Sequence, residues 1–161
     1  MMKHRIVRIA IFVLAVLGAL TAFAGGVGIL TGAITFPLEF LQGTPFIDYT
    51  IPGLALAILV GGSFLFAAVT IFTGREMGVL ASALAGLFMI GFEVVEIAIV
   101  DRFGGNGLSI AVALQAFFSM LGLTIFGLAS YLWMAEYRPA PSPQVDRKGQ
   151  PYYTRRERPT V

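Results

Sequence analysis

The stretch IPGLALAILVGGSFLFAAVTIFTGREMGVLASALAGLFMIGFEVVEIAIV, residues 51–100, decides the fold of this chain. It holds two long apolar runs, about residues 51–72 and 77–100, separated only by the short polar segment 73–76. Each run covers ~30 Å or more as a helix, which is enough to cross the hydrocarbon core of a bilayer. Gly74 is typical of a helix C-terminus, where a left-handed residue is needed. The stretch therefore predicts two adjacent, antiparallel membrane-spanning helices.

The composition of the whole chain agrees with a membrane protein. Of 161 residues, 57% are hydrophobic and only 12% are charged, whereas a soluble domain carries about 25% charged residues. Two further apolar runs, about residues 9–24 (continuing toward Leu30) and 108–134, bring the number of spans to four. Backbone hydrogen bonds must close within each segment inside a bilayer, so all four spans should be helices. The sequence predicts an all-α, membrane-spanning four-helix bundle formed by residues 1–135.

The residue types limit the chemistry that the chain can perform. There is no cysteine, and the only histidine, His4, lies in the N-terminal segment. Disulfides, thiolate metal sites and a buried bis-histidine haem site within one chain are therefore excluded. The serines Ser63 and Ser119 lack a histidine or lysine partner for nucleophilic catalysis. We expect no cofactor, no metal and no enzyme activity.

The lysines and arginines predict how the chain is threaded. Ten of the eleven lie before the first span, between the second and third spans or after the fourth, and only Arg102 lies on the opposite side. Because basic residues favour cytoplasmic loops, both termini should be cytoplasmic in a bacterial plasma membrane. Tyr131, Trp133 and Tyr137 fit an interfacial belt on that side. The pI of 9.2 then reflects this topology, and no nucleic-acid partner is expected.

The N-terminal segment has a second interpretation. KHRIVRIAIFVLAVLGALTAFA, residues 3–24, has a basic start, an apolar core and a small-residue end, as a cleavable signal peptide does. Cleavage would leave three spans. Against cleavage, the apolar character continues through residues 25–30 and no polar mature region follows. Both alternatives stay open, and retention is favoured.

The outer segment TFPLEFLQGTPFIDYTIPG, residues 35–53, is the least generic part of the chain. Thr35 can cap a short interfacial helix in which Glu39 meets the positive end of the helix dipole, and Gly43 can end it. Asp48 or Thr50 can cap the second span. Glu39 and Asp48 could also bind a cation, although capping and solvation explain them more simply.

The C-terminal segment, residues 136–161, differs in character from the spans. It contains five prolines and mixed charges and has little apolar content. Such a composition is typical of disorder. We expect a cytoplasmic tail whose main role is to set topology.

The run GTPFIDYTIPGL, residues 43–54, resembles a run that precedes the second span in small bacterial four-span membrane proteins of unassigned function. Those proteins also tend to carry acidic and glutamine positions in their third and fourth spans, as Glu93, Glu96 and Gln115 are here. The resemblance covers the four spans and not the tail. It implies a bacterial four-span protein and carries no implication about chemistry.

Three polar residues inside the spans are the candidate site. Glu93 and Glu96 are three residues apart and project to one face of a helix. Glu93 lies ~10 Å below the outer end of the third span, and Gln115 lies at the same depth in the fourth. We therefore expect Glu93 to hydrogen-bond with Gln115, or to share a small polar cavity with it and Glu96. Arg102 is the candidate ion-pair partner of Glu96.

The sequence leaves three functional hypotheses open. A structural or interaction component, with the bilayer and a second copy or another membrane protein as partners, comes first. A proton- or cation-coupled transporter or channel subunit that uses the Glu93 and Glu96 face comes second, because intramembrane carboxylates mark such routes. A lipid- or quinone-interacting enzyme comes third. A dry, well-packed surround would argue against the last two.

Overall fold

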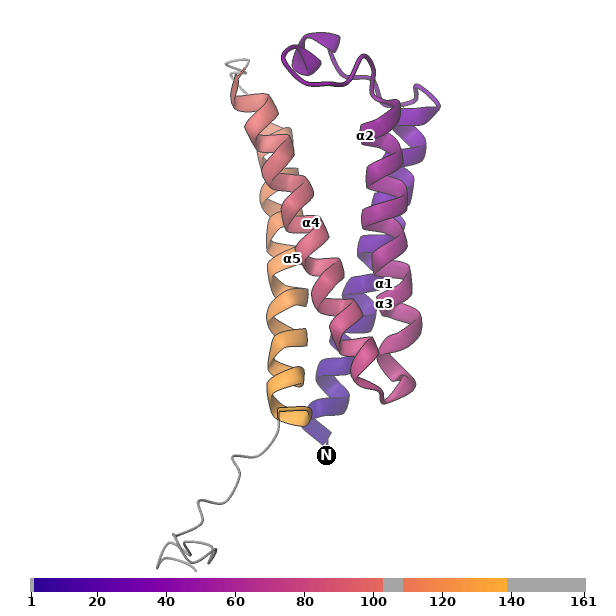
Figure 1. Cartoon of the computed structure of the whole chain (residues 1–161), viewed down its shortest axis with the longest axis vertical. Helices are drawn as coiled ribbons and strands as arrows, with labels where there is room; N and C mark the ends of the chain where they lie inside the picture. Colours follow the sequence, from indigo (N-terminus) through magenta and orange to yellow (C-terminus); the bar gives the residue numbers. More distant parts are fainter. Residues whose placement is uncertain (1, 103–108, 139–161) are drawn as a thin grey trace, which may run out of the picture.

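The structure, a computed structural model, describes residues 2–102 and 109–138, and the side chains of residues 3–98 and 113–138. The described elements are helical throughout, without a strand (Figure 1). Helix α1 spans Met2–Leu30, α4 spans Glu76–Arg102 and α5 spans Ser109–Glu136. The second span is built from α2 (Thr50–Leu54), the π-helix η2 (Ala55–Gly61), α3 (Gly62–Thr70) and the 3-10 turn η3 (Ile71–Thr73).

Four of these helical segments are long and apolar enough to cross a membrane: Lys3–Leu30, Thr50–Thr73, Glu76–Ala98 and Ala113–Glu136. The predicted all-helical, four-span architecture is therefore confirmed, and it indicates a multi-pass membrane protein. Spans two, three and four begin and end within a few residues of the predicted positions. Helix α1 is longer than the predicted first span because it begins at Met2 and includes Arg8.

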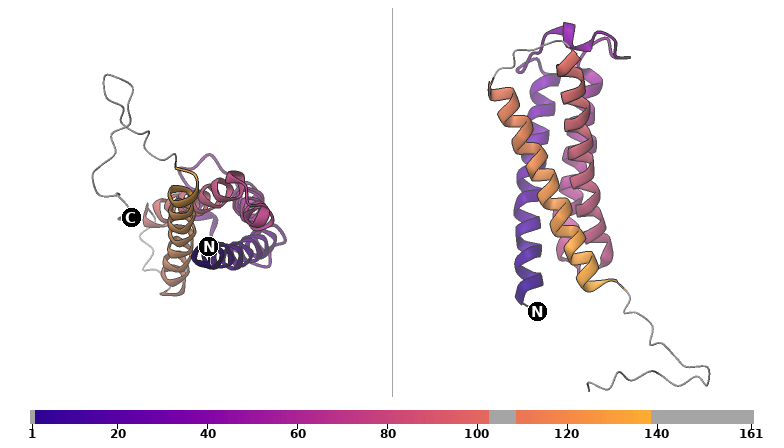
Figure 2. Two further views of the ribbon diagram at one scale, coloured as in Figure 1. Left: turned by 90° about the horizontal axis from the view of Figure 1, so that it is seen from below. Right: turned by 90° about the vertical axis from the view of Figure 1, so that its left-hand side faces the viewer.

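The four spans run side by side, with the N-terminus and the end of α5 at one end of the bundle (Figures 1 and 2). We call this the terminal end; the connection at Gly74 also lies there. The opposite end, which carries residues 31–49 and Arg102, is the loop end. Helices α4 and α5 make the most extensive contact, α1 packs on the second span, and the contact between α1 and α5 is smaller. Towards the loop end the α4–α5 pair diverges from α1 and α2 (Figure 1).

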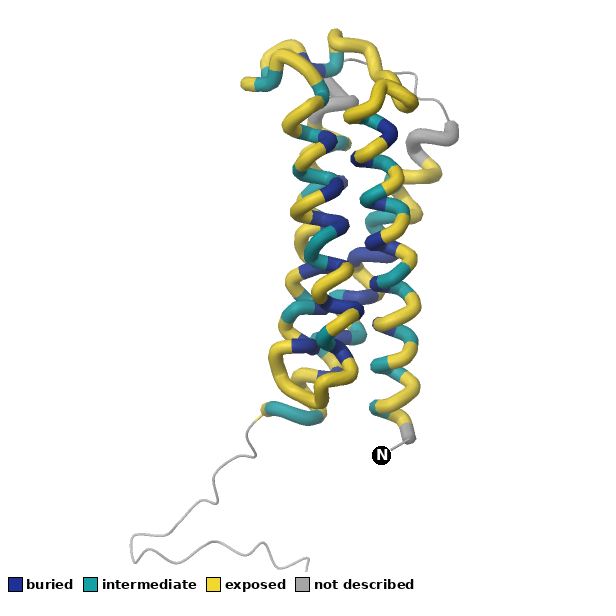
Figure 3. The backbone as a smooth tube through the Cα atoms, turned by 90° about the vertical axis from the view of Figure 1, so that its right-hand side faces the viewer, coloured by how far each residue is buried: buried dark blue, intermediate teal, exposed yellow. Residues whose placement is uncertain are grey.

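Burial is confined to the inward face of each helix, and the outward faces are apolar and exposed (Figure 3). One buried cluster occupies the middle of the bundle around Phe64, Met89 and Ile125. A second cluster closes the terminal end with Ile11, Ile71, Val79, Ala129 and Leu132. A surface of exposed leucine, valine and phenylalanine is what lipid tails solvate, so the exposed faces fit a bilayer environment.

Glycines allow the helices to approach closely at two contacts. A Cβ on Gly86 of α4 would lie 2.7 Å from the Gly122 carbonyl oxygen of α5 and 2.9 Å from the Phe126 nitrogen. A Cβ on Gly26 of α1 would lie 2.7 Å from the Ala57 Cβ and 2.8 Å from the Gly53 carbonyl oxygen of the second span. Small residues at such positions let backbones pack directly in membrane proteins.

The π-helix in the second span was not predicted. The backbone N–H of Gly62 donates to the carbonyl of Ala57, five residues earlier, as well as to those of Ile58 and Leu59. This widened segment, Ala55–Gly61, packs against α1 and includes the position opposite Gly26. Segments of this kind are rare and are frequent at functional sites.

The connection between α1 and α2 is held by its own hydrogen bonds. The Tyr49 hydroxyl donates to the Pro37 carbonyl at 2.9 Å, and the Tyr49 ring packs on Phe36. Burial raises the pKa of Tyr49, which keeps this donor protonated. The Thr44 hydroxyl donates to the Leu41 carbonyl at 2.7 Å. The segment is therefore a built loop with a defined shape.

The predicted short helix in this loop is a four-residue 3-10 turn, η1 (Leu38–Leu41). It begins after Pro37, without a side-chain cap, so the expected capping role of Thr35 is wrong. Gln42 follows the turn in an extended conformation, and Gly43 has a φ of +77°, which fits its expected place at the end of the short helix. Leu41 is buried and η1 contacts α4, so the turn folds over the loop end of the bundle.

Candidate functional site

Glu93 is the most unusual buried residue of the described bundle. It lies on α4 with only 4% of its surface exposed. Ser82, another buried polar residue, donates its hydroxyl proton to the Gly78 carbonyl of its own helix at 2.7 Å. The Oε2 atom of Glu93, in contrast, is buried without a hydrogen-bond partner. Such an atom bears the full cost of its desolvation.

Glu96 and Gln115 lie beside Glu93. Glu96 is one turn further along α4, close enough for its charge to act on Glu93. The Gln115 side-chain amide, on α5, interacts with the Glu96 carboxyl group. Both residues are partly buried, and Nε2 of Gln115 lacks a partner that meets hydrogen-bond geometry. We call these three residues the polar cluster.

The structure therefore brings together the three residues that were expected to meet. The Gln115 amide interacts with Glu96, whereas equal depth had suggested Glu93 as its partner. The expected hydrogen bond is not closed at Glu93 Oε2 or at Gln115 Nε2. Counting residues along antiparallel helices gives only the depth of a side chain in the bundle. Which neighbour the side chain faces also depends on how each helix is rotated about its axis, and the count does not give that rotation.

The surroundings of the polar cluster are apolar towards the terminal end. Going down α4 and α5, the buried side chains are Met89, Ala85, Leu121 and Ile125. Below them the second buried cluster closes the bundle. Among the described residues, the carboxyl groups inside the middle of the bundle thus lie near the loop end. Towards the terminal end the core is apolar apart from Ser82, whose hydroxyl donates to its own helix, until the ion pair of Glu136 with Arg8.

The remaining predicted positions have simpler roles or fall outside the description. The Asp48 carboxylate accepts a hydrogen bond from the Thr50 N–H at 2.9 Å. The N-cap of the second span is Tyr49, without a side-chain cap, so the expected capping by Asp48 or Thr50 is wrong. Glu39 is exposed in the first turn of η1. The expected pairing of Arg102 with Glu96 falls on a side chain outside the described residues. Among the described residues, no group of three or more histidine, cysteine, aspartate and glutamate side chains could hold a metal.

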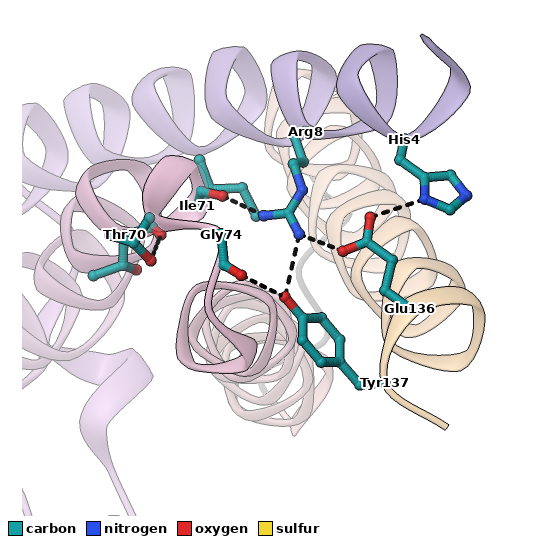
Figure 4. A network of polar contacts seen from close by, with 8 residues as sticks. His4, Arg8, Thr70, Ile71, Gly74, Glu136 and Tyr137 are labelled. Atoms are coloured by element: carbon teal, nitrogen blue, oxygen red, sulfur yellow. Dashed lines mark hydrogen bonds and ion pairs between the residues drawn. The ribbon is translucent and has the colours of Figure 1, made fainter. Parts of the chain in front are cut away.

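A second polar network at the terminal end was missed at the level of sequence (Figure 4). Arg8 of α1 donates from Nη1 to the Ile71 carbonyl at 2.6 Å and from Nη2 to Glu136 Oε2 of α5 at 2.5 Å. His4 Nδ1 lies 3.0 Å from the other oxygen of Glu136. The Tyr137 hydroxyl lies 3.3 Å from Arg8 Nη2 and donates to the Gly74 carbonyl at 3.1 Å. We call these contacts the terminal clasp.

The terminal clasp joins α1, the connection at Gly74 and α5. The Arg8 and Glu136 side chains are only 13% and 20% exposed, so this ion pair is largely removed from water. Next to the clasp, the Trp133 indole N–H donates to the Glu76 carboxylate at 2.7 Å, which ties α5 to the start of α4. Glu136, taken from the sequence as the first residue of the tail, is thus the last residue of α5 and a partner in this network.

A signal for the terminal clasp was present in the sequence. Arg8 and Glu136 carry opposite charges and lie at span ends that the topology places on one side. Because Arg8 was interpreted only as a determinant of membrane topology, its ion pair with Glu136 was not predicted. The terminal clasp is a stabilising network, because its acidic and basic groups are paired with one another.

The described surface is hollowed at the loop end and between α1 and α5. One, of ≈ 470 Å³, is at the loop end between the end of α1 and the α1–α2 connection, and is lined by residues including Thr31, Thr35, Asp48 and Tyr49. The other, of ≈ 220 Å³, is a groove between α1 and α5 lined by Leu14, Leu17, Phe117, Met120, Leu121 and Thr124. The groove is apolar and opens towards lipid, so it is suited to contact a lipid acyl chain.

Comparison of the chain with protein-family models, with curated proteins and with solved structures finds no match. The resemblance of residues 43–54 to small four-span proteins therefore stays a prediction from those residues alone. The functional argument depends on the geometry of the polar cluster, the terminal clasp and the α1–α2 connection.

Proposed function

We propose that this chain is a small integral component of a bacterial plasma membrane that acts by contact with another membrane protein. In this proposal both termini face the cytoplasm and the loop end faces outward, as the distribution of lysine and arginine favours. The contact surface is the α1–α2 connection, residues 31–49. The part of the chain that follows α5 serves as a cytoplasmic tail.

The shape of residues 31–49 carries the proposal. Long connections with little secondary structure are usually functional in compact proteins, and this one is held by the Tyr49–Pro37 and Thr44–Leu41 hydrogen bonds. It nevertheless presents apolar side chains: Ile47 is 91% exposed and Leu38 is 62% exposed. A loop that is already rigid loses little conformational entropy when it binds a partner. Exposed apolar groups on such a loop therefore favour a docking role.

Transport through the bundle is supported less well. A proton or cation route needs polar groups along its whole length, whereas the half of the core towards the terminal end is packed with apolar side chains. A lipid- or quinone-modifying enzyme would need several polar groups converging on a pocket. The groove between α1 and α5 offers only the Thr124 hydroxyl, which already donates to the Met120 carbonyl at 2.7 Å. The loop-end hollow has more polar groups in its lining, but there the Tyr49 hydroxyl and the Asp48 carboxylate are already hydrogen-bonded to the backbone.

A photo-crosslinking residue at position 47 tests the docking role. We expect ultraviolet light to give one discrete protein adduct in native membranes, because Ile47 stands out from the loop. The matched control is the same residue at Leu59, which is 52% exposed on the second span and should give lipid adducts only. The partner, identified by mass spectrometry, should then bind the purified chain and lose affinity at least tenfold with Ile47→Lys. Lipid adducts at both positions would contradict the proposal.

A further inference from the structure

We propose that the polar cluster is a binding site for one proton held together with one water molecule, inside the membrane-spanning part of the bundle. Nothing in the proposed docking function requires this site, so the two can be tested separately. The site consists of the Glu93 and Glu96 carboxyl groups of α4 and the Gln115 amide of α5. The argument follows from the two unpartnered atoms, the charge of the pair and the side from which the cluster can be reached.

The two unpartnered atoms define the chemistry of the ligand. Glu93 Oε2 is an acceptor when the carboxyl group is ionised, and Gln115 Nε2, on the amide that interacts with Glu96, is a donor; both atoms are buried and neither makes a hydrogen bond of good geometry. A group that completes both atoms must donate to the first and accept from the second. A hydroxyl or a water molecule does this, whereas a bare metal cation cannot accept from an N–H. Buried water characteristically satisfies polar groups of this kind in protein interiors.

The negative charge of the two carboxyl groups favours the binding of one proton. Ionising both carboxyl groups at once would place two like charges in a buried pair, which costs several kcal/mol in a membrane interior. The described cationic side chains that could offset such charges, Lys3, His4, Arg5, Arg8, Arg75 and Arg138, belong to the terminal end. One proton shared by the pair removes one charge and leaves a single carboxylate to accept from the water.

The polar groups shown to act on the pair come from two elements. From α4 it is Glu96 that acts on Glu93, and from α5 it is the uncharged Gln115. The second span also packs on α4 and carries no titratable side chain, and Glu39 of η1 is exposed. The side chains of Asp101 and Arg102, further along α4, lie outside the described residues, so substitution of Arg102, the candidate counter-ion, belongs to the test.

Access to the polar cluster is one-sided. Glu96 is partly buried rather than sealed, and the cluster lies near the loop end of α4. Towards the terminal end the core is apolar. A proton can therefore enter and leave from the loop end only, which makes the cluster a proton-binding site that responds to pH on one side of the membrane.

Infrared spectroscopy of the full chain in lipid vesicles tests this inference. Spectra are recorded in H₂O and D₂O over a pH series, for wild type and for Glu93→Gln, Gln115→Leu and Arg102→Gln. The matched control is Glu39→Gln, which removes an exposed carboxyl group of the same kind. The amide I band of each sample reports whether the variant is helical, and the wild-type spectra alone already show whether a protonated carboxyl group is present.

We expect a protonated-carboxyl band in wild type that moves in D₂O, is lost in Glu93→Gln, shifts in Gln115→Leu and is unchanged in Glu39→Gln and Arg102→Gln. Four results would overturn the inference. The first three are the lack of a Glu93-dependent protonated band at every pH, a band that Gln115→Leu leaves unmoved, and a band that sodium or potassium removes at constant pH. A band that appears only in Arg102→Gln would also overturn it, because Arg102 would then be the counter-ion.

Discussion

Replacing Gly86 with valine is expected to destabilise the bundle by about 3 kcal/mol, the upper part of the usual range for overpacking. The new Cβ would lie 2.7 Å from the Gly122 carbonyl oxygen and 2.9 Å from the Phe126 nitrogen. Both atoms belong to the backbone of α5, which cannot move aside as a flexible side chain can. Helices α4 and α5 must therefore separate along their most extensive contact. Unfolding by sodium dodecyl sulfate in mixed micelles measures the loss.

The chain offers a matched control for this prediction on the same helix. Gly91 lies five residues further along α4, and a Cβ there meets nothing within 4 Å. Gly91→Val should leave stability within about 0.5 kcal/mol of wild type, because valine has a slightly better helix propensity than glycine and opens no clash. Gly122→Val and Gly127→Val repeat the comparison on α5, since Gly127 is also open. Equal losses at Gly86 and Gly91 would mean that the α4–α5 contact is not as described.

Replacing Arg8 with methionine is expected to cost about 3 kcal/mol, the lower part of the range for removing one partner of a buried ion pair. The change leaves Glu136 without its arginine partner and removes the donor to the Ile71 carbonyl. Arg5 provides the control, because it is exposed on the same helix; Arg5→Met should lie within about 0.5 kcal/mol of wild type. The measurement is again unfolding in mixed micelles.

A double-mutant cycle separates the ion pair from other effects of the Arg8 change. Arg8→Met combined with Glu136→Leu replaces the pair with apolar groups, which is often neutral for a buried pair. The double variant should recover at least half of the stability that Arg8→Met loses. If Arg8→Met costs no more than Arg5→Met, the terminal clasp does not hold α1 to α5.

Local patterns in the sequence were sufficient for the fold and for part of the candidate site. Span length follows from apolar run length, so the ends of the second, third and fourth spans could be placed within a few residues. The polar cluster followed from the three-residue spacing of Glu93 and Glu96 and from the short connection between the third and fourth spans. These inferences need only helix geometry and the order of the spans along the chain.

Features that depend on how separate helices meet could not be predicted in the same way. The Arg8–Glu136 pair joins the first and last spans, and their contact depends on how the bundle closes on itself. The π-helix at Ala55–Gly61 has no separate signature in an apolar run. Which of the two glutamates interacts with Gln115 depends on how α4 and α5 are rotated about their axes. Because every face of these helices is apolar, the sequence pattern does not determine that rotation.

The proposed outward orientation of the loop end underlies both the proposed docking surface and the proposed one-sided access to the polar cluster. The chain has no cysteine, so one introduced cysteine reports its own position. Gln42→Cys lies on the exposed α1–α2 connection, and Thr73→Cys lies at the exposed turn between the second and third spans. In intact cells an impermeant maleimide should label position 42 and should reach position 73 only after the membrane is opened. Labelling of position 73 with position 42 protected would contradict the account.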